Sequence, residues 1–172
     1  MEAPNTNELN RLVNLERIFH NRSCYVITAS EAEKIALAKR FDLISVDTLE
    51  AKYDVKPSET SQGGFWVTGH LHANVVQSCV VTLAPVKGEI NTDISLYVID
   101  EKYETENPLD SEQDVDFEYS IQGEIDLGEI TAQYLSLSLN PYPRAPGEEE
   151  DITLEKFKDK QNPFSALAKL KS

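Results

Sequence analysis

The sequence lacks the features that mark a membrane protein, a secreted protein or a disulfide-stabilised domain. Its 172 residues include two cysteines, Cys24 and Cys79. We interpret both as reduced thiols, because disulfides are uncommon in cytosolic domains of this size. No apolar run approaches the roughly 18 residues of a membrane span, and the first residues lack the basic-then-apolar pattern of a secretory signal. We therefore expect a cytoplasmic protein without membrane attachment.

Catalytic and cofactor motifs are also missing. There is no Gly-x-Ser-x-Gly, no glycine-rich phosphate loop and no His-Glu-x-x-His. His70 and His72 would share one face of a strand, as pairs of metal ligands sometimes do, but no spacing signature supplies a third ligand. Two exposed histidines are the simpler interpretation, and a small metal-dependent enzyme at this pair remains an alternative. We expect no catalytic residue, no metal and no cofactor.

Basic residues are outnumbered, and the excess acid is unevenly placed. The chain has 16 Lys and Arg against 30 Asp and Glu, for a net charge of −14. Residues 87–142 hold 2 basic and 14 acidic residues, whereas 1–86 hold 8 and 10, and 143–172 hold 6 and 6. An acidic segment repels phosphate backbones, so a basic protein partner fits better than naked nucleic acid. Acidity that serves only solubility is an open alternative.

Hydrophobic periodicity predicts an α+β fold. We expect a disordered leader at 1–9, a single domain at 10–142, and an acidic and Lys-rich linker at 143–172 that ends in a short helix. The domain should be a curved or barrel-like antiparallel sheet of roughly six strands covered by two helices. The expected strands lie near residues 12–18, 23–29, 43–55, 65–81, 89–100 and 115–121, and the expected helices near 30–41 and 127–139.

Local signals give these elements their details. Ser30 with Glu33 predicts a capping box at the start of the first helix, and Asp126 is expected to cap the second helix with Glu129 in its first turn. Gly69 suggests a bulge or bend in the longest strand. Residues 84–88 are expected to form the hairpin turn. The buried stripe of the second helix is expected at Leu127, Ile130, Tyr134 and Leu137, with Leu135 as a further candidate.

Four short motifs carry a family resemblance. They are Gln-Ser-Cys-Val-Val-Thr-Leu-Ala-Pro-Val at 77–86, Asp-Leu-Gly-Glu at 126–129, Asn-Pro-Tyr-Pro-Arg-Ala-Pro-Gly at 140–147 and Asn-Pro-Phe-Ser-Ala-Leu-Ala-Lys-Leu-Lys at 162–171. Together they resemble the YceD family, the large ribosomal RNA subunit accumulation proteins of bacteria and plastids, in the form seen in alphaproteobacteria. The motif residues are Cys79, Leu83, Pro85, Asp126, Leu127, Glu129, Pro141, Tyr142, Pro143 and Arg144.

The resemblance implies a non-catalytic factor in large ribosomal subunit biogenesis, acting in accumulation of 23S rRNA. Many members of the family carry Cys-x-Arg-Cys-Leu where this chain has Cys79-Val80-Val81-Thr82-Leu83. Thr82 therefore stands in place of the second cysteine. If the paired cysteines bind metal in the family, this chain has lost that capacity.

We expect partner binding at three places, each with a different chemistry. Residues 100–118, which we call the acidic segment, offer carboxylates. The corner after the second helix offers residue types that anchor interfaces, and the C-terminal helix offers a small apolar face. The corner has a structural alternative, in which Tyr142 packs on the sheet. The candidate residues are Glu104, Glu106, Asp110, Glu112, Asp114, Asp116 and Glu118, then Tyr142 and Arg144, then Phe164, Leu167 and Leu170.

The expected partner is a basic ribosomal protein or a pre-large-subunit particle, bound by a monomer. Direct contact with rRNA is left open. An alternative is an RNA-binding protein that uses the basic residues of the N-terminal third, provided they converge on one face. These residues are Arg11, Arg17, Arg22, Lys34, Lys39, Arg40, Lys52 and Lys56.

Overall fold

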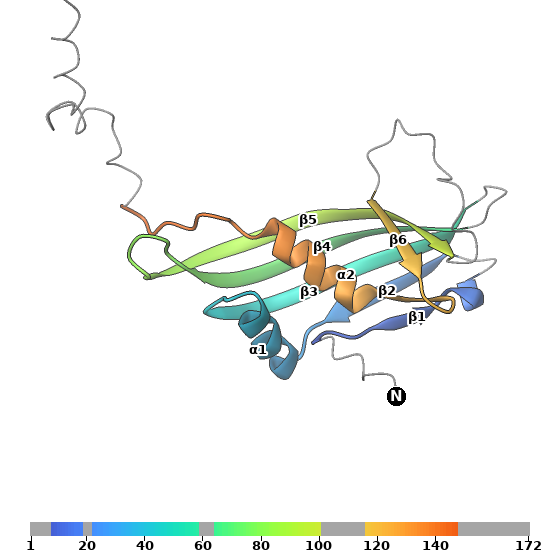
Figure 1. Cartoon of the computed structure of the whole chain (residues 1–172), viewed down its shortest axis with the longest axis horizontal. Coiled ribbons are helices and arrows are strands. Elements are labelled where there is room, and N and C mark those ends of the chain that lie inside the picture. The colour runs from blue at the N-terminus through green and yellow to red at the C-terminus, as the bar shows by residue number, and fades with distance from the viewer. Residues whose placement is uncertain (1–7, 19–21, 59–63, 101–115, 148–172) are drawn as a thin grey trace, which may run out of the picture.

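The structure is a computed structural model that describes residues 8–18, 22–58, 64–100 and 116–147 (Figure 1). Long strands dominate the described part of the chain, and two helices accompany them. In order, the elements are β1 (Leu12–Asn14), the 3₁₀ helix η1 (Leu15–Ile18), β2 (Ser23–Thr28), α1 (Glu31–Arg40), β3 (Ser45–Pro57), β4 (Phe65–Ser78), β5 (Pro85–Asp100), β6 (Asp116–Ser120), β7 (Glu124–Asp126) and α2 (Leu127–Ser138).

Five strands form one open sheet in the order β2-β3-β4-β5-β6, and β1 pairs with β7 in a separate two-stranded sheet. The predicted α+β class is confirmed, but the sheet is not closed. It is also mixed, because β6 runs parallel to β5, with Leu96 opposite Asp116 and Asp100 opposite Ser120. The 15 residues at 101–115 are long enough for the return connection that a parallel neighbour requires.

The core lies on one face of the large sheet. Along β4 the residues at period two (Phe65, Val67, Leu71, Ala73 and Val75) are buried, as the sequence predicts. They join one hydrophobic cluster with side chains of α1, α2 and the 9–18 segment. α2 crosses this face (Figure 1). The opposite face is polar around His70 and His72, but near the end of β5 it holds the buried Tyr97, which packs against Trp66 and Phe117.

Gly69 is not a bulge, because the pairing of β3 with β4 continues through Tyr53 opposite Gly69. The irregularity lies in β3, between Val46 and Thr48. A Cβ atom at Gly69 would lie 2.6 Å from the Lys52 carbonyl oxygen and 2.9 Å from the Tyr53 ring. Glycine is therefore needed here to make room for the buried Tyr53 side chain.

The turn between β4 and β5 also differs from the expectation. It is formed by residues 79–84, because β5 already begins at Pro85, whereas the sequence suggested residues 84–88. The expected strand at 12–18 is divided into β1 and the 3₁₀ helix η1. Both differences are shifts of element boundaries, which local patterns define least well.

Two burial predictions need correction. Leu137 is 80% exposed, and the buried face of α2 is formed instead by Leu127, Ile130, Thr131, Ala132 and Leu135. Leu137 lies two residues, or about 200°, beyond Leu135 on the helix, so both cannot face the sheet. At the N-terminus, Leu9 is fully buried, although the expected leader included it. Leu9 is therefore packed into the core.

Candidate functional site

The Asp-Leu-Gly-Glu motif builds the start of α2. The Asp126 carboxylate accepts hydrogen bonds from the backbone N–H groups of Gly128 (2.9 Å) and Glu129 (3.2 Å). It also accepts one from the N–H of Arg11 at 2.8 Å. Asp126 is thus the predicted N-cap, and it additionally attaches the N-terminal segment to the helix.

The other motif residues hold the same junction. A Cβ atom at Gly128 would overlap the carbonyl oxygen of Leu9, so only glycine lets the two backbones approach this closely. Glu129 accepts two hydrogen bonds from Arg40 (2.9 and 2.7 Å), and Arg40 also pairs with Glu8 (3.0 Å). These contacts give the Asp-Leu-Gly-Glu motif a structural role.

The motifs at 77–86 and 140–147 meet at the end of the β4–β5 hairpin. The backbone N–H of Val80 donates to the carbonyl oxygen of Pro143 at 2.9 Å, and Gln77 Nε2 donates to the carbonyl oxygen of Asn140 at 2.9 Å. We call residues 77–85 and 140–147 the motif junction. Two segments about sixty residues apart in the sequence thus form one structural unit, seen beside the β4–β5 turn in Figure 1.

The turn inside the junction has an unusual backbone. The N–H of Leu83 donates to the carbonyl oxygen of Cys79 (2.9 Å), and the N–H of Cys79 donates to that of Ala84 (2.8 Å). Leu83 closes this turn in the left-handed region, with φ of 62°. That conformation costs a non-glycine residue about 1–2 kcal/mol.

Cys79 lies at the centre of the junction with no exposed surface. Its sulfur accepts the backbone N–H of Ala145 at 3.4 Å. The side chain of Thr82, then the backbone groups of Thr82, Val81 and Ala145, lower the pKa of the Cys79 thiol to about 7. Thr82, which stands where the resemblance has a second cysteine, therefore contacts Cys79 directly.

The outer surface of the junction is apolar. Val80, Val81, Leu83 and Tyr142 are exposed, with Leu83 and Tyr142 at 76% and 72%, and Arg144 is exposed beside them. We call these five residues the tip surface. Tyr142 does not pack on the sheet, because Pro143 is the buried residue of the corner. Sequence reasoning selected Tyr142 and Arg144 but missed Val80 and Val81, although paired apolar residues in a turn were a visible signal.

The acidic candidates do not join this surface. Two of them, Asp116 and Glu118, are among the described residues. Asp116 accepts a hydrogen bond from the Tyr134 hydroxyl at 2.7 Å. Glu118 is half-buried, and its burial together with the carboxylate of Glu129 raises its pKa. Asp116 lies opposite Leu96 on β5, roughly 35 Å along the strand from Pro85 at 3.3 Å per residue. Glu104, Glu106, Asp110, Glu112, Asp114, Phe164, Leu167 and Leu170 lie outside the described residues.

Most of the basic residues on which the RNA-binding alternative depends form ion pairs. Six of the eight form ion pairs with carboxylates. Arg17 and Lys39 form no ion pair with another described residue. Arg11 pairs with Glu33, Arg22 and Lys56 with Asp54, Lys34 with Glu31, Arg40 with Glu8 and Glu129, and Lys52 with Glu50. Paired cations release fewer counterions on binding phosphate, so this arrangement does not favour an RNA surface.

The histidine pair lies on the polar face of the sheet. His70 Nδ1 is 2.8 Å from Asp93 and His72 Nε2 is 3.2 Å from Glu89, and these side chains are all well exposed. Across the described ranges, no group of three or more His, Cys, Asp or Glu side chains could hold a metal ion. The metal-enzyme alternative therefore lacks a ligand set in this region.

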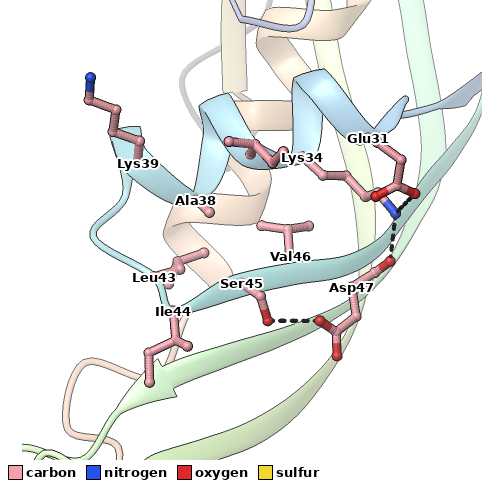
Figure 2. Close-up of a pocket in the computed structure, with 10 residues that line it drawn as sticks. Glu31, Lys34, Ala38, Lys39, Leu43, Ile44, Ser45, Val46 and Asp47 are labelled. Atoms are coloured by element: carbon pink, nitrogen blue, oxygen red, sulfur yellow. Dashed lines mark hydrogen bonds and ion pairs between the residues drawn. The ribbon is translucent and has the colours of Figure 1, made fainter.

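A shallow groove of about 600 Å³ lies between α1 and the start of β3 (Figure 2). Ala38, Leu43 and Val46 line its floor. Lys34 on its rim donates to the Asp47 carbonyl oxygen (2.9 Å) and pairs with Glu31 (2.6 Å). The groove has balanced charge, and on its rim the Ser45 hydroxyl donates to the Asp47 carboxylate at 2.7 Å. Among the described lining residues no histidine and no set of oxyanion donors accompanies this pair, so it does not form a catalytic constellation.

Taken together, the described part of the chain defines an open α+β protein whose motifs at 77–86 and 140–147 meet in one exposed surface. The family model described as "Large ribosomal RNA subunit accumulation protein YceD" matches residues 67–171, and the chain belongs to this family. No curated protein and no solved structure matches the chain. No helix among the described residues is long and apolar enough to cross a membrane.

Proposed function

We propose that this protein is a non-catalytic factor in large ribosomal subunit biogenesis, and that it binds a basic ribosomal protein or a pre-ribosomal particle. Membership of the YceD family supports the ribosomal role, because the family is named for accumulation of the large ribosomal RNA subunit. The charge of the chain supports the chemistry of the partner, because residues 87–142 hold 14 acidic and 2 basic residues.

The conformation and exposure of Leu83 carry the assignment of a contact surface. This motif residue combines a left-handed backbone with a side chain that is 76% exposed. Glycine would relieve the backbone strain, and a polar side chain would relieve the exposure. Strain that persists in a defined structure points to a use beyond stability. We infer that the tip surface is kept apolar in order to dock on the partner.

The acidic segment supplies a second contact, and its described members Asp116 and Glu118 pair with the second half of β5. A contact at Asp116 would lie roughly 35 Å along β5 from the tip surface, a separation that suits a partner of comparable length. This separation favours a particle, or a protein with an extended shape, over a small compact one. Each contact raises the effective concentration of the other, so two weak surfaces bind with useful avidity.

Affinity capture of the full chain from cells, with crosslinking, tests the proposal. We expect ribosomal proteins or large-subunit precursors to be recovered, and recovery of neither would contradict the proposal. Glu112→Lys with Asp114→Lys should weaken capture and reduce its salt dependence. The control is Glu89→Lys with Asp93→Lys, which makes the same change in net charge on the polar face of the sheet. Equal effects of the two variants would remove the acidic segment from the interface.

A further inference from the structure

The outer edge of β2 pairs with no other strand among the described residues. β2 is the first strand of the five-stranded sheet, with β3 on one side. Its sequence, Ser-Cys-Tyr-Val-Ile-Thr, contains no charge and no proline. Natural edge strands are usually protected against pairing by lysine, proline, bulges or a covering segment. β2 has no such residue.

The free backbone groups of this edge belong to Cys24, Val26 and Thr28. The N–H of Ala29 donates to the carbonyl oxygen of Leu49 at 3.1 Å, and the two strands pair in register from Ser23–Val55 to Thr28–Glu50. In an antiparallel pair, hydrogen-bonded rows alternate with rows whose groups point outward. The odd-numbered residues therefore bond β3, and the even-numbered residues point their N–H and C=O groups away from it.

These outward groups have no backbone partner among the described residues, and their side chains are exposed, Val26 at 65%. β1 does not occupy the edge, since it pairs with β7. A cavity of about 330 Å³, lined by residues that include Val13, Arg17 and Tyr25, separates β1 from β2. The edge thus has outward-pointing hydrogen-bonding groups that no described strand occupies.

We propose that β2 pairs antiparallel with β2 of a second copy of this chain, across a two-fold axis at Val26. The free groups form a set that is symmetric about Val26, so this register leaves none of them unmatched. Cys24 bonds Thr28 of the second copy, Val26 bonds its own equivalent, and Thr28 bonds Cys24 of the second copy. The pairing makes six backbone hydrogen bonds and joins two five-stranded sheets into one.

The neighbouring side chains fit this register. Opposed residues face the same side of the sheet, as pairing requires, so the exposed Val26 side chains cover each other. Tyr25 of the second copy points toward the side of the open cavity. Arg22 comes opposite Ser30 of the second copy and near its Glu31, whose carboxylate is exposed. Arg22 and Glu31 already pair with Asp54 and Lys34 of their own chain, so the two ends of the pairing bring no unpaired like charges together.

A second copy is favoured as the partner because β2 carries no charge that opposes its own copy and because the exposed Val26 side chains cover each other on the axis. The result departs from the monomer expected from the sequence. Each chain carries a net charge of −14, so the two copies repel each other at long range. Added salt screens this repulsion and should strengthen dimerisation. Capture of a basic partner should respond to salt in the opposite direction.

Engineered disulfides test the register. In the Cys24→Ser background, Val26→Cys places two thiols on the two-fold axis. The Cα atoms of a hydrogen-bonded antiparallel pair lie about 5.5 Å apart, which suits a disulfide. We expect mild oxidation to yield a covalent dimer from Cys24→Ser/Val26→Cys. Thr28→Cys alone should also crosslink, through Cys24 of the second copy, whereas Cys24→Ser/Thr28→Cys should not.

Sedimentation of the uncrosslinked protein gives an independent readout. The wild type should dimerise with rising concentration, and Val26→Lys, which places two like charges on the axis, should remain monomeric while keeping its circular dichroism spectrum. A wild type that stays monomeric and a Val26→Cys variant that does not crosslink would overturn the proposal. Equal crosslinking of Cys24→Ser/Thr28→Cys would refute the register. A β2 edge that pairs only when ribosomal material is added would show that a different strand is its partner.

Discussion

The backbone N–H of Val80 donates a 2.9 Å hydrogen bond to the carbonyl oxygen of Pro143. This bond joins the β4–β5 turn to the segment that follows α2. Each segment alone is a short turn exposed to water, but together they bury Cys79 and Pro143. The family motifs at 77–86 and 140–147 therefore describe one structural unit, and their exposed residues form one surface.

Gly128→Ala should destabilise the domain by about 2 kcal/mol or more. Alanine is the better helix former by about 1 kcal/mol, but its Cβ atom would overlap the Leu9 carbonyl oxygen. Relief of this overlap must displace the N-terminal segment and its buried Leu9 side chain. Chemical denaturation measures the effect.

Gly88→Ala is the matched control for this substitution. Its Cβ atom would lie 3.7 Å from a methyl group of Val75, an ordinary van der Waals contact, so its free energy of unfolding should change by less than about 0.5 kcal/mol. If both variants unfold alike, the close approach at Gly128 does not control the stability of this region.

Acidification should weaken the fold through Glu33. The hydrogen bonds from Arg11, then those from Ser30, lower the pKa of Glu33 from 4.5 to about 2. A carboxylate whose pKa is lowered in the folded protein stabilises the fold at pH values above its pKa in the unfolded chain. This contribution is lost as the pH falls from 4.5 toward 2. Glu33→Gln should therefore flatten the decline in stability over this window, by about 1 kcal/mol for a partly exposed pair.

Thermal unfolding at a series of pH values measures this difference. Glu31→Gln, in the same first turn but highly exposed, is the control and should leave the profile of the wild type unchanged. A Glu33→Gln profile that runs parallel to that of the wild type would show that the pair with Arg11 does not stabilise the fold.

Thiol labelling should report on the motif junction. Cys24 is exposed and Cys79 is buried, so a thiol reagent should modify Cys24 at once and Cys79 only when the junction opens. Hydrogen bonds lower the pKa of Cys79 to about 7, but low pKa without access gives no reactivity. Pro143→Ala should leave the Cys24 rate constant and increase that of Cys79. Equal labelling of both cysteines in the wild type would contradict a closed junction.

Local chemistry made much of the fold predictable. The capping box of Ser30 and Glu33 and the cap at Asp126 are confirmed, because each depends on residues within one turn. The inward face of β4 follows from strict alternation. The features that could not be predicted depend on partners far away in the sequence. The parallel direction of β6 is set by pairing with β5, and the exposure of Leu137 depends on which face of α2 meets the sheet.

The candidate site shows the same limit more strongly. The motifs at 77–86 and 140–147 were selected from the sequence, but their contact is visible only once the hairpin and α2 are placed. The left-handed conformation of Leu83 has no local signal, because glycine or asparagine is the residue expected there. The acidic residues, by contrast, were selected on charge alone, and the described pair is bonded to Tyr134 or half-buried.

The most direct test of the account is to compare stability with partner capture for Leu83→Gly. Relief of the left-handed strain should leave the free energy of unfolding equal to that of the wild type or up to about 1 kcal/mol higher. Loss of the exposed side chain should reduce capture of ribosomal material about tenfold, as expected for an anchoring residue. Leu12→Ser, an exposed apolar residue on β1, should not change capture. Wild-type capture by Leu83→Gly would contradict the tip surface as the binding site.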